Sequence, residues 1–174
     1  MLDILRQRRS VRDFSAEPIA TETLELLREA VLRAPTSRNR QPWQFIFVEQ
    51  KGLIEELAKS KAHGTRFLES AQLALVIAAD PAVSDVWAED CAIAAIIAQL
   101  AAEDLGLKSC WGQLRLRAHD EQSSAGDYVR GLLDIPAGFE VPIIIGFGHP
   151  LKPLEGHQRD DLSWAKLHRN RFGA

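Results

Sequence analysis

Cysteine and long apolar runs are scarce in this 174-residue sequence, and both shortages exclude classes of protein. Cys91 and Cys110 are not spaced like zinc ligands, and two cysteines are too few for a disulfide framework. The longest apolar run, 91–98, falls well short of the roughly 20 residues that cross a bilayer. The amino terminus carries Asp3 and no apolar stretch of signal-peptide length. We therefore expect a cytoplasmic protein.

Glycine motifs that cradle phosphates are missing as well. The segment Gly146-Phe147-Gly148 lacks the third glycine of a dinucleotide-binding turn, and it leads to Pro150 rather than into a helix. No Walker motif occurs. Any phosphate must then be held by guanidinium groups and hydroxyls.

Two further kinds of site are not expected. No two of the five histidines have the i, i+4 spacing of a helical metal pair. No serine lies in a G-x-S-x-G context, so nucleophilic catalysis has no support. We predict no metal ligand and no side chain acting as acid, base or nucleophile.

The composition is that of an ordinary globular protein. Hydrophobic residues make up 46% of the chain and charged residues 26%, which argues against disorder and fibrous architectures. A net charge of -3 argues against nucleic acid as a general partner. The length fits one domain, and no linker or repeat interrupts residues 1–174, so we expect a single domain.

Helices and strands alternate along the predicted order. Leu24, Leu27 and Val31 recur at helical spacing, and we expect Thr21 to cap that helix and Pro35 to end it. Further helices are predicted over 51–60, 84–105 and 128–133 and after Asp161, and strands over 44–48, 74–79, 109–114 and 141–146. Four strands interleaved with about five helices predict a layered α/β or α+β fold.

The helix predicted over 84–105 is the longest, with Ser84 as its expected cap and Gly106 as its terminator. Alanine or isoleucine occupies nearly every side of it between Ala92 and Ala98, so we expect it to be buried almost all round. Its alanines would let a second helix approach closely. The centre of a dimer interface and the central helix of a monomeric core both remain open.

Two short segments near the amino terminus carry the strongest functional signal. Residues 6–12 hold four arginines and Ser10, a density of planar charged donors that suits a phosphate. Residues 35–43 contain Asn39 and Gln41, whose amides both donate and accept, as the polar edge of a heterocycle requires. Taken alone, the first segment could be a solvated helix end, and the second an ordinary polar loop with Trp43 in the core.

The pair of segments resembles the amino-terminal half of the FMN-dependent nitroreductase family. In that family an R-R-S-x-R-like turn and a P-S-x-x-N-x-Q-P-W-like turn bracket a flavin. The resemblance continues through Asp90, the residues Ser109-Cys110-Trp111-Gly112, and Gly148-His149-Pro150. It covers nearly the whole chain, roughly residues 4–170, and includes His157-Gln158-Arg159, where the family places a K-x-R that reaches the phosphate.

The resemblance implies an α+β fold of three layers, α-β-α, with a central, mostly antiparallel sheet. It implies an oxidoreductase that passes hydride from NAD(P)H through FMN to a nitroaromatic or quinone, in a homodimer with each flavin at the interface. The arginine turn would come from one subunit and the residues 35–41 from the other. The implied cofactor-binding residues are Arg8, Arg9, Ser10, Arg12, Pro35, Thr36, Ser37, Asn39, Gln41, Ser109, Cys110, Trp111, Gly112 and Arg159.

Three departures from the family pattern are visible. Ile96-Ile97 stands where many members carry Gln-Asn, Lys108 replaces a glycine beside the ring, and His157 replaces a lysine near the phosphate. The short connection 80–90 leaves no room for a helical lid. A same-fold enzyme of dehalogenase or flavin-destructase type, a non-catalytic flavin-binding module and a purely structural protein remain alternatives.

Overall fold

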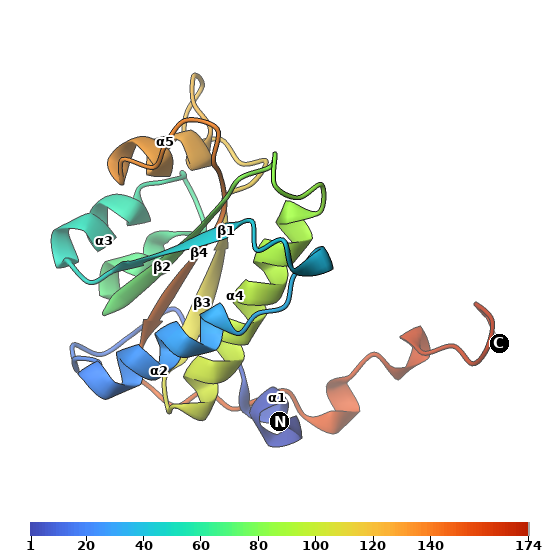
Figure 1. The fold of residues 1–174 in the computed structure, drawn as a ribbon. Coiled ribbons are helices and arrows are strands. Elements are labelled where there is room, and N and C mark those ends of the chain that lie inside the picture. Colours follow the sequence, from blue (N-terminus) through green and yellow to red (C-terminus); the bar gives the residue numbers. More distant parts are fainter. Residues whose placement is uncertain (174) are drawn as a thin grey trace.

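The computed structural model describes residues 1–173, which form one four-stranded sheet with helices on both faces (Figure 1). The strand order is β1-β2-β4-β3, and every neighbouring pair is antiparallel. The strands are β1 (Trp43–Val48), β2 (Leu73–Ala79), β3 (Lys108–Gln113) and β4 (Glu140–Gly148). All four lie within one residue or two of the predicted strands at each end.

Strands β2 and β4 are central because their side chains are apolar on both faces. All seven residues of β2 are buried, as are eight of the nine in β4. Strands β1 and β3 are the edges of the sheet, and both mix buried with partly exposed positions. One edge of the sheet therefore belongs to the segment 109–112, which the sequence marks as functional.

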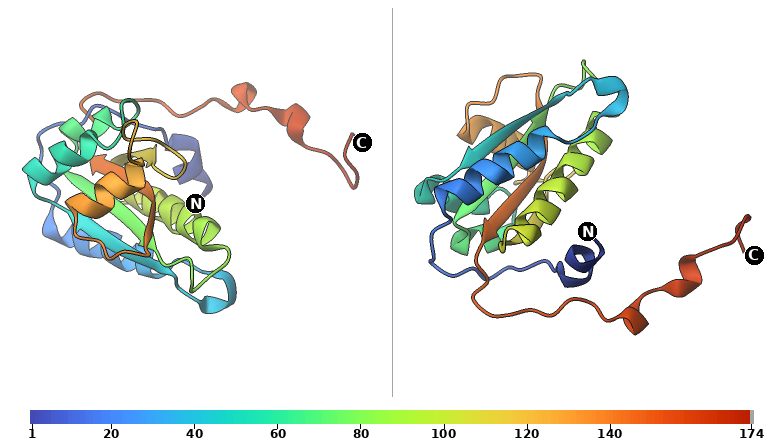
Figure 2. Two further views of the ribbon diagram at one scale, coloured as in Figure 1. Left: turned by 90° about the horizontal axis from the view of Figure 1, so that it is seen from above. Right: turned by 60° about the horizontal axis from the view of Figure 1, so that its bottom comes forward.

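Helices cover the two faces in separate layers (Figure 2). Helices α2 (Thr21–Leu32) and α4 (Trp87–Asp104) pack on one face. Helices α3 (Lys51–Ala58) and α5 (Ala125–Leu132) pack on the other, together with the short helix η2 (Arg66–Ser70). The short α1 (Leu2–Gln7) contacts α4. The expected α-β-α layering with an antiparallel sheet is confirmed.

Two predicted helix caps are wrong. The residue before α2 is Ala20, and Thr21 is already the first helical residue, without a side-chain cap. Helix α4 begins at Trp87, because the hydroxyl of Ser84 donates to the carboxylate of Asp90 instead of capping the helix. The predicted terminator is confirmed, since Gly106 follows α4 with a φ of +80°.

The expectation that α4 is buried almost all round is also wrong within this chain. Its inner face is closed by alanines such as Ala94, Ala95 and Ala98. Its outer face leaves Ile93 and Ile96 each 39% exposed. An unpartnered apolar stripe therefore runs over the middle of the longest helix.

The tail after β4 leaves the globular part as an extended arm (Figures 1 and 2). The helix predicted after Asp161 is wrong, because the arm forms only the three-residue turns Arg159–Asp161 and Trp164–Lys166. Its apolar side chains Leu162, Trp164 and Leu167 are exposed, so the chain offers no surface that would stabilise a helix there. Across residues 1–173, no helix is both long and apolar enough for a membrane span.

Candidate functional site

The arginine turn is fixed to edge strand β3 by its backbone. Ser10 and Ser109 form a parallel bridge, and the backbone N–H of Val11 donates to the carbonyl of Ser109 at 3.0 Å. Phe14, 4% exposed, packs closely over Gly148, so the extended segment is pinned at both ends. Arg8, which follows α1, is therefore held beside the start of β3.

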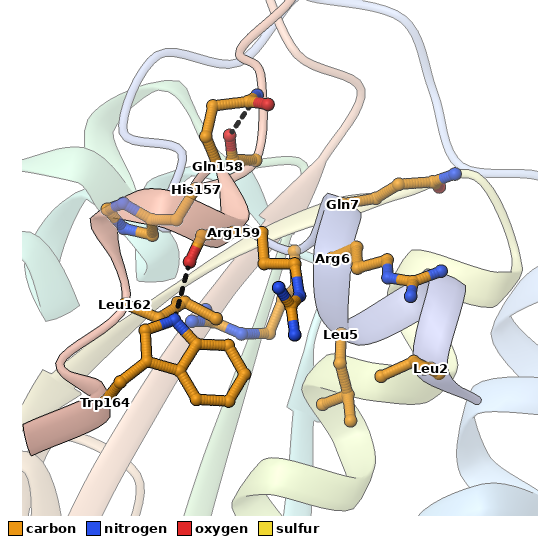
Figure 3. A pocket seen from close by; sticks show the side chains of 11 residues that line it. Leu2, Leu5, Arg6, Gln7, His157, Gln158, Arg159, Leu162 and Trp164 are labelled. Carbon is orange, nitrogen blue, oxygen red and sulfur yellow. Dashed lines mark hydrogen bonds between the residues drawn. The ribbon is translucent and has the colours of Figure 1, made fainter. Parts of the chain in front are cut away.

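Arg8 and Arg159 line one cavity, although 150 residues separate them. The cavity has a volume of about 880 Å³. Figure 3 shows its two walls: Leu2, Leu5, Arg6 and Gln7 from α1, and His157, Gln158, Arg159, Leu162 and Trp164 from the tail. The guanidinium of Arg159 also lies 4.7 Å from the centre of the Trp164 ring. Two cations from opposite ends of the chain thus share one concave site.

Arg9 and Arg12 do not line this cavity. A guanidinium nitrogen of Arg9 donates to the carbonyl of Glu155 at 2.6 Å, which ties the tail to the arginine turn. Arg12 lines a separate groove of about 460 Å³ with Ser10 and Lys152. The four arginines of residues 6–12 therefore divide into Arg6 and Arg8, which line the cavity with Arg159, and two side chains with other surroundings.

The free edge of β3 presents backbone groups. In an antiparallel ladder, alternate residues direct both backbone groups away from the partner strand. Ser109 does so, since its carbonyl accepts from Val11, and the same alternation turns Trp111 and Gln113 outward. The carbonyl of Gln113 accepts from the ammonium of Lys61 at 2.8 Å. The N–H and C=O of Trp111 therefore lie between two occupied positions on this edge.

The side chains of Ser109 and Cys110 pack inside the protein. The hydroxyl of Ser109 accepts from the amide of Gln99 at 3.0 Å. Cys110 is 3% exposed, and burial raises the pKa of its thiol. A Cβ on Gly112 would lie 2.9 Å from Cγ2 of Ile144, so only glycine fits there without a shift. This segment can contact a ligand through its backbone rather than through these side chains.

A buried carboxylate holds the second predicted turn. Asp90, 2% exposed, accepts from the backbone N–H of Ser37 at 2.9 Å and from the hydroxyl of Ser84 at 3.0 Å. Asp90 thus satisfies a backbone donor in a loop 53 positions away in the sequence. The turn is thereby fastened to the first turn of α4.

The backbone of this turn is unusual. Arg38, Asn39 and Gln41 have φ values of 52°, 55° and 50°, in the left-handed region that non-glycine residues rarely adopt. The Thr36 hydroxyl accepts from the backbone N–H of Gln41 at 3.0 Å, and the side-chain amide of Gln41 donates to that of Asn39 at 3.2 Å. Strain of this kind persists only where surrounding contacts impose it, and it is concentrated at binding sites.

The structure keeps the two turns apart within one chain. One is attached to α4 through Asp90 and the other, by way of Ser109, through Gln99. Asp90 and Gln99 are nine positions apart on α4, which corresponds to about 14 Å along the helix axis at 1.5 Å per residue. Gln41 lines a groove with Trp43 and Phe45 that contains no arginine of the first turn. Trp43 itself is 7% exposed, which confirms its predicted place in the core.

Sequence reasoning missed two supporting residues, Gln99 and Lys61. A glutamine within an alanine-rich helix and a lysine in a polar loop carry no local signal of their partners. In residues 1–173 no group of three or more His, Cys, Asp or Glu side chains could hold a metal ion. The connection between β2 and α4 is a seven-residue turn without a helix.

Comparison with known proteins places these features in a family. A model of the Nitroreductase family matches residues 5–76. A protein of Archaeoglobus fulgidus, provisionally named NADH dehydrogenase/NAD(P)H nitroreductase, is 31% identical over 98% of both chains. The solved structure of an FMN-dependent nitroreductase from Clostridium difficile R20291 superposes with a TM-score of 0.96, at 38% identity over 99% of this chain and 100% of that one. An NADPH:FMN oxidoreductase from Vibrio harveyi, solved with NAD⁺, shares the fold at 24% identity, with a TM-score of 0.81 over 99% of this chain and 78% of that one.

Proposed function

The chain belongs to the nitroreductase family, and on that basis we propose that it is an FMN-dependent oxidoreductase that uses NAD(P)H. The chemistry that FMN supplies when bound is two-electron transfer, with hydride taken from NAD(P)H and electrons given to an electron-poor acceptor. The protein's part is to bind, orient and tune that group. The observation that carries the proposal is the cavity shared by Arg8 and Arg159 beside the open edge of β3.

The residues present fit the two ends of FMN. A phosphate with nearly two negative charges needs several charge-assisted donors, and Arg8 and Arg159 supply them from facing walls. The polar edge of the flavin ring needs a donor and an acceptor side by side, and the outward N–H and C=O of Trp111 offer that pair. In this proposal Ser109, Cys110 and Gly112 shape the strand, and Ser10 and Arg12 line the path between the ends. Arg9 fixes the tail that carries Arg159.

A homodimer along α4 would bring the second turn to the same site. Ile93 and Ile96 lie near the middle of α4, so a two-fold axis through them would pair the amino end of one helix with the carboxyl end of the other. The exposed residues 35–41 of one chain would then face the arginine turn of its partner. Pro35, Thr36, Ser37, Asn39 and Gln41 are the residues that this partner contributes in our proposal.

The visible spectrum of freshly purified protein tests the function. We expect the paired bands of bound flavin, and we expect NADPH or NADH to bleach them under anaerobic conditions. Addition of a nitroaromatic or a quinone should restore the bands. Bound flavin that neither nicotinamide reduces would favour a binding module, and protein that takes up no added FMN would overturn the proposal. We also propose that the enzyme acts in the cytoplasm.

A further inference from the structure

A second group of cations surrounds the open edge of β3, apart from the cavity of Arg8 and Arg159. Lys61, partly buried, reaches the end of the strand through its bond to Gln113. Arg117 lies in the loop that follows, and this loop lies against the segment of Lys61, because the Nδ1 atom of His119 is 3.2 Å from the carbonyl oxygen of Ser60. Arg12 approaches from the start of the strand. The charges of Arg12 and Lys61 both act on the Cys110 thiol, so both lie within electrostatic reach of the middle of β3.

Arg12, Lys61 and Arg117 lie near one another without a carboxylate partner among residues 1–173. In the part of the chain that the structure describes, none of the ion pairs includes Arg12, Lys61 or Arg117. Many of the other surface cations do have a partner, as Arg40 has in Asp85. Asp120, the acid of the neighbouring loop, already accepts from the Ser123 hydroxyl and from the backbone N–H groups of Gln122 and Ser123.

The absence of a partner is costly for Lys61. Burial, and secondly the nearby charge of Arg117, lower the pKa of Lys61. An ammonium that is partly withdrawn from water and faces another cation is poorly compensated by one carbonyl. An anion placed between Lys61 and Arg117 would relieve both effects. The structure thus holds an anion-attracting position at the ring end of the proposed site, whereas the FMN phosphate is assigned to Arg8 and Arg159.

We propose that Lys61 and Arg117 bind an anionic group on the acceptor, so that this enzyme prefers nitroaromatics or quinones carrying a carboxylate or phosphate. The inference rests on the proposed function, because it assumes that the flavin ring lies along the edge of β3. Arg12, nearer the start of the strand, is left to balance negative charge on the reduced ring. The acceptor would lie against the ring with its charged group toward the end of β3.

The test compares two acceptors of nearly equal shape on the flavin-loaded enzyme, 4-nitrobenzoate and neutral 4-nitrobenzamide. We expect kcat/KM to be about tenfold higher for the anion, through charge-assisted contacts at a partly buried site. Raising salt from about 0.02 M to about 0.2 M should lower kcat/KM for the anion alone, because screening acts on the charged substrate. Benzoate, which cannot be reduced, gives a second readout through its effect on the flavin absorbance.

Substitutions test which residues cause the preference for the anionic acceptor. Lys61→Met should remove about tenfold of the preference and weaken benzoate binding by a similar factor, and Arg117→Gln should remove about threefold. Lys61→Arg keeps the charge and should restore most of the preference. Arg115→Gln is the matched control, because Arg115 is a cation of the same loop that lies over the Trp87 ring, 5.5 Å from its centre, on the α4 side.

The possible results distinguish failure of the proposed acceptor preference from failure of the proposed oxidoreductase function. Flavin-loaded enzyme that reduces both acceptors equally, with no change in Lys61→Met, would overturn the inference and leave the oxidoreductase in place. A change in KM for NADPH, without a change for NADH or 4-nitrobenzoate, would assign the cations to the donor's phosphate and also overturn it. Protein that binds no flavin would overturn the proposed function, and the inference with it.

Discussion

The two ends of helix α4 hold the two halves of the candidate site by different means. At the amino end, the buried carboxylate of Asp90 fastens a turn whose backbone is strained. At the carboxyl end, the arginine turn is joined to β3 by an isolated parallel bridge and shows no left-handed residue between Arg8 and Phe14. The turn of residues 35–41 is fastened mainly by one side chain, that of Asp90, whereas the arginine turn is fastened by backbone pairing with β3. A single substitution should therefore disrupt the turn of residues 35–41 far more easily than the arginine turn.

The largest expected effect comes from separating the two chains of the proposed homodimer. Ile93→Glu combined with Ile96→Glu places two charges on the apolar stripe of α4, and burying them unpaired should raise the dimer dissociation constant by more than about a thousandfold. If the ends of α4 meet only across the dimer, the variant should also lose FMN. Light scattering at fixed protein concentration measures the mass, and absorbance measures the flavin content.

The control for this variant is Leu32→Glu, on α2, where the leucine is 62% exposed. It adds a charge to an apolar surface position outside the stripe, and we expect a dimer with normal flavin content. A double variant on α4 that stays dimeric and yellow would show that the two ends are not joined in this way.

The next largest effect is expected from removing the carboxylate of Asp90 at the amino end of α4. Asp90→Ala leaves the Ser37 N–H and the Ser84 hydroxyl without their charged acceptor, and we expect a loss of about 3 kcal/mol in the free energy of unfolding. Asp90→Asn keeps one carbonyl oxygen for Ser37 and should lose only about 1–2 kcal/mol. Urea denaturation without added FMN measures both values. An alanine variant as stable as the parent would mean that the turn does not depend on this carboxylate.

Much of the fold was predictable because its signals are local. The apolar runs of β2 and β4, the i, i+3, i+7 spacing of α2 and the stop at Gly106 all depend on neighbouring residues. The tail was not predictable, because its leucines and Trp164 suggest a helix but find no surface to cover in this chain. The local sequence pattern indicates which secondary structure a segment can adopt, and contacts with the rest of the chain determine which one it adopts.

The candidate site was likewise predictable only where its signals are local. Charge density along 6–12 marked the phosphate-binding segment, and the motif near the tail marked Arg159. The orientation of each arginine was not predictable, because the bridge between Ser10 and Ser109 joins residues 99 positions apart. The support from Asp90, Gln99 and Lys61 also depends on contacts that no local pattern records.

A third experiment addresses the carboxyl end. Arg8→Ala with Arg159→Ala removes both facing cations, and we expect FMN affinity to fall about a hundredfold, since each charge-assisted contact contributes about 1.5 kcal/mol or more. Riboflavin has no phosphate, so its affinity should change little. Stability should also change little, because neither side chain is buried. Equal losses for FMN and riboflavin would place the phosphate elsewhere, and Arg12→Ala, which we expect to affect both ligands, tests that alternative.

The smallest effects provide the finest comparison of the two ends. Ser109→Ala removes the acceptor of the Gln99 amide, and Thr36→Val removes the acceptor of the Gln41 N–H, so each should cost about 1 kcal/mol of stability. Their effects on FMN should differ. The carboxyl end offers backbone groups that Ser109→Ala leaves in place, so its FMN affinity should stay within about twofold, whereas the strained turn loosened by Thr36→Val should lose about fivefold. Equal FMN losses in calorimetric titrations would contradict the division between a backbone-held end and a side-chain-held end.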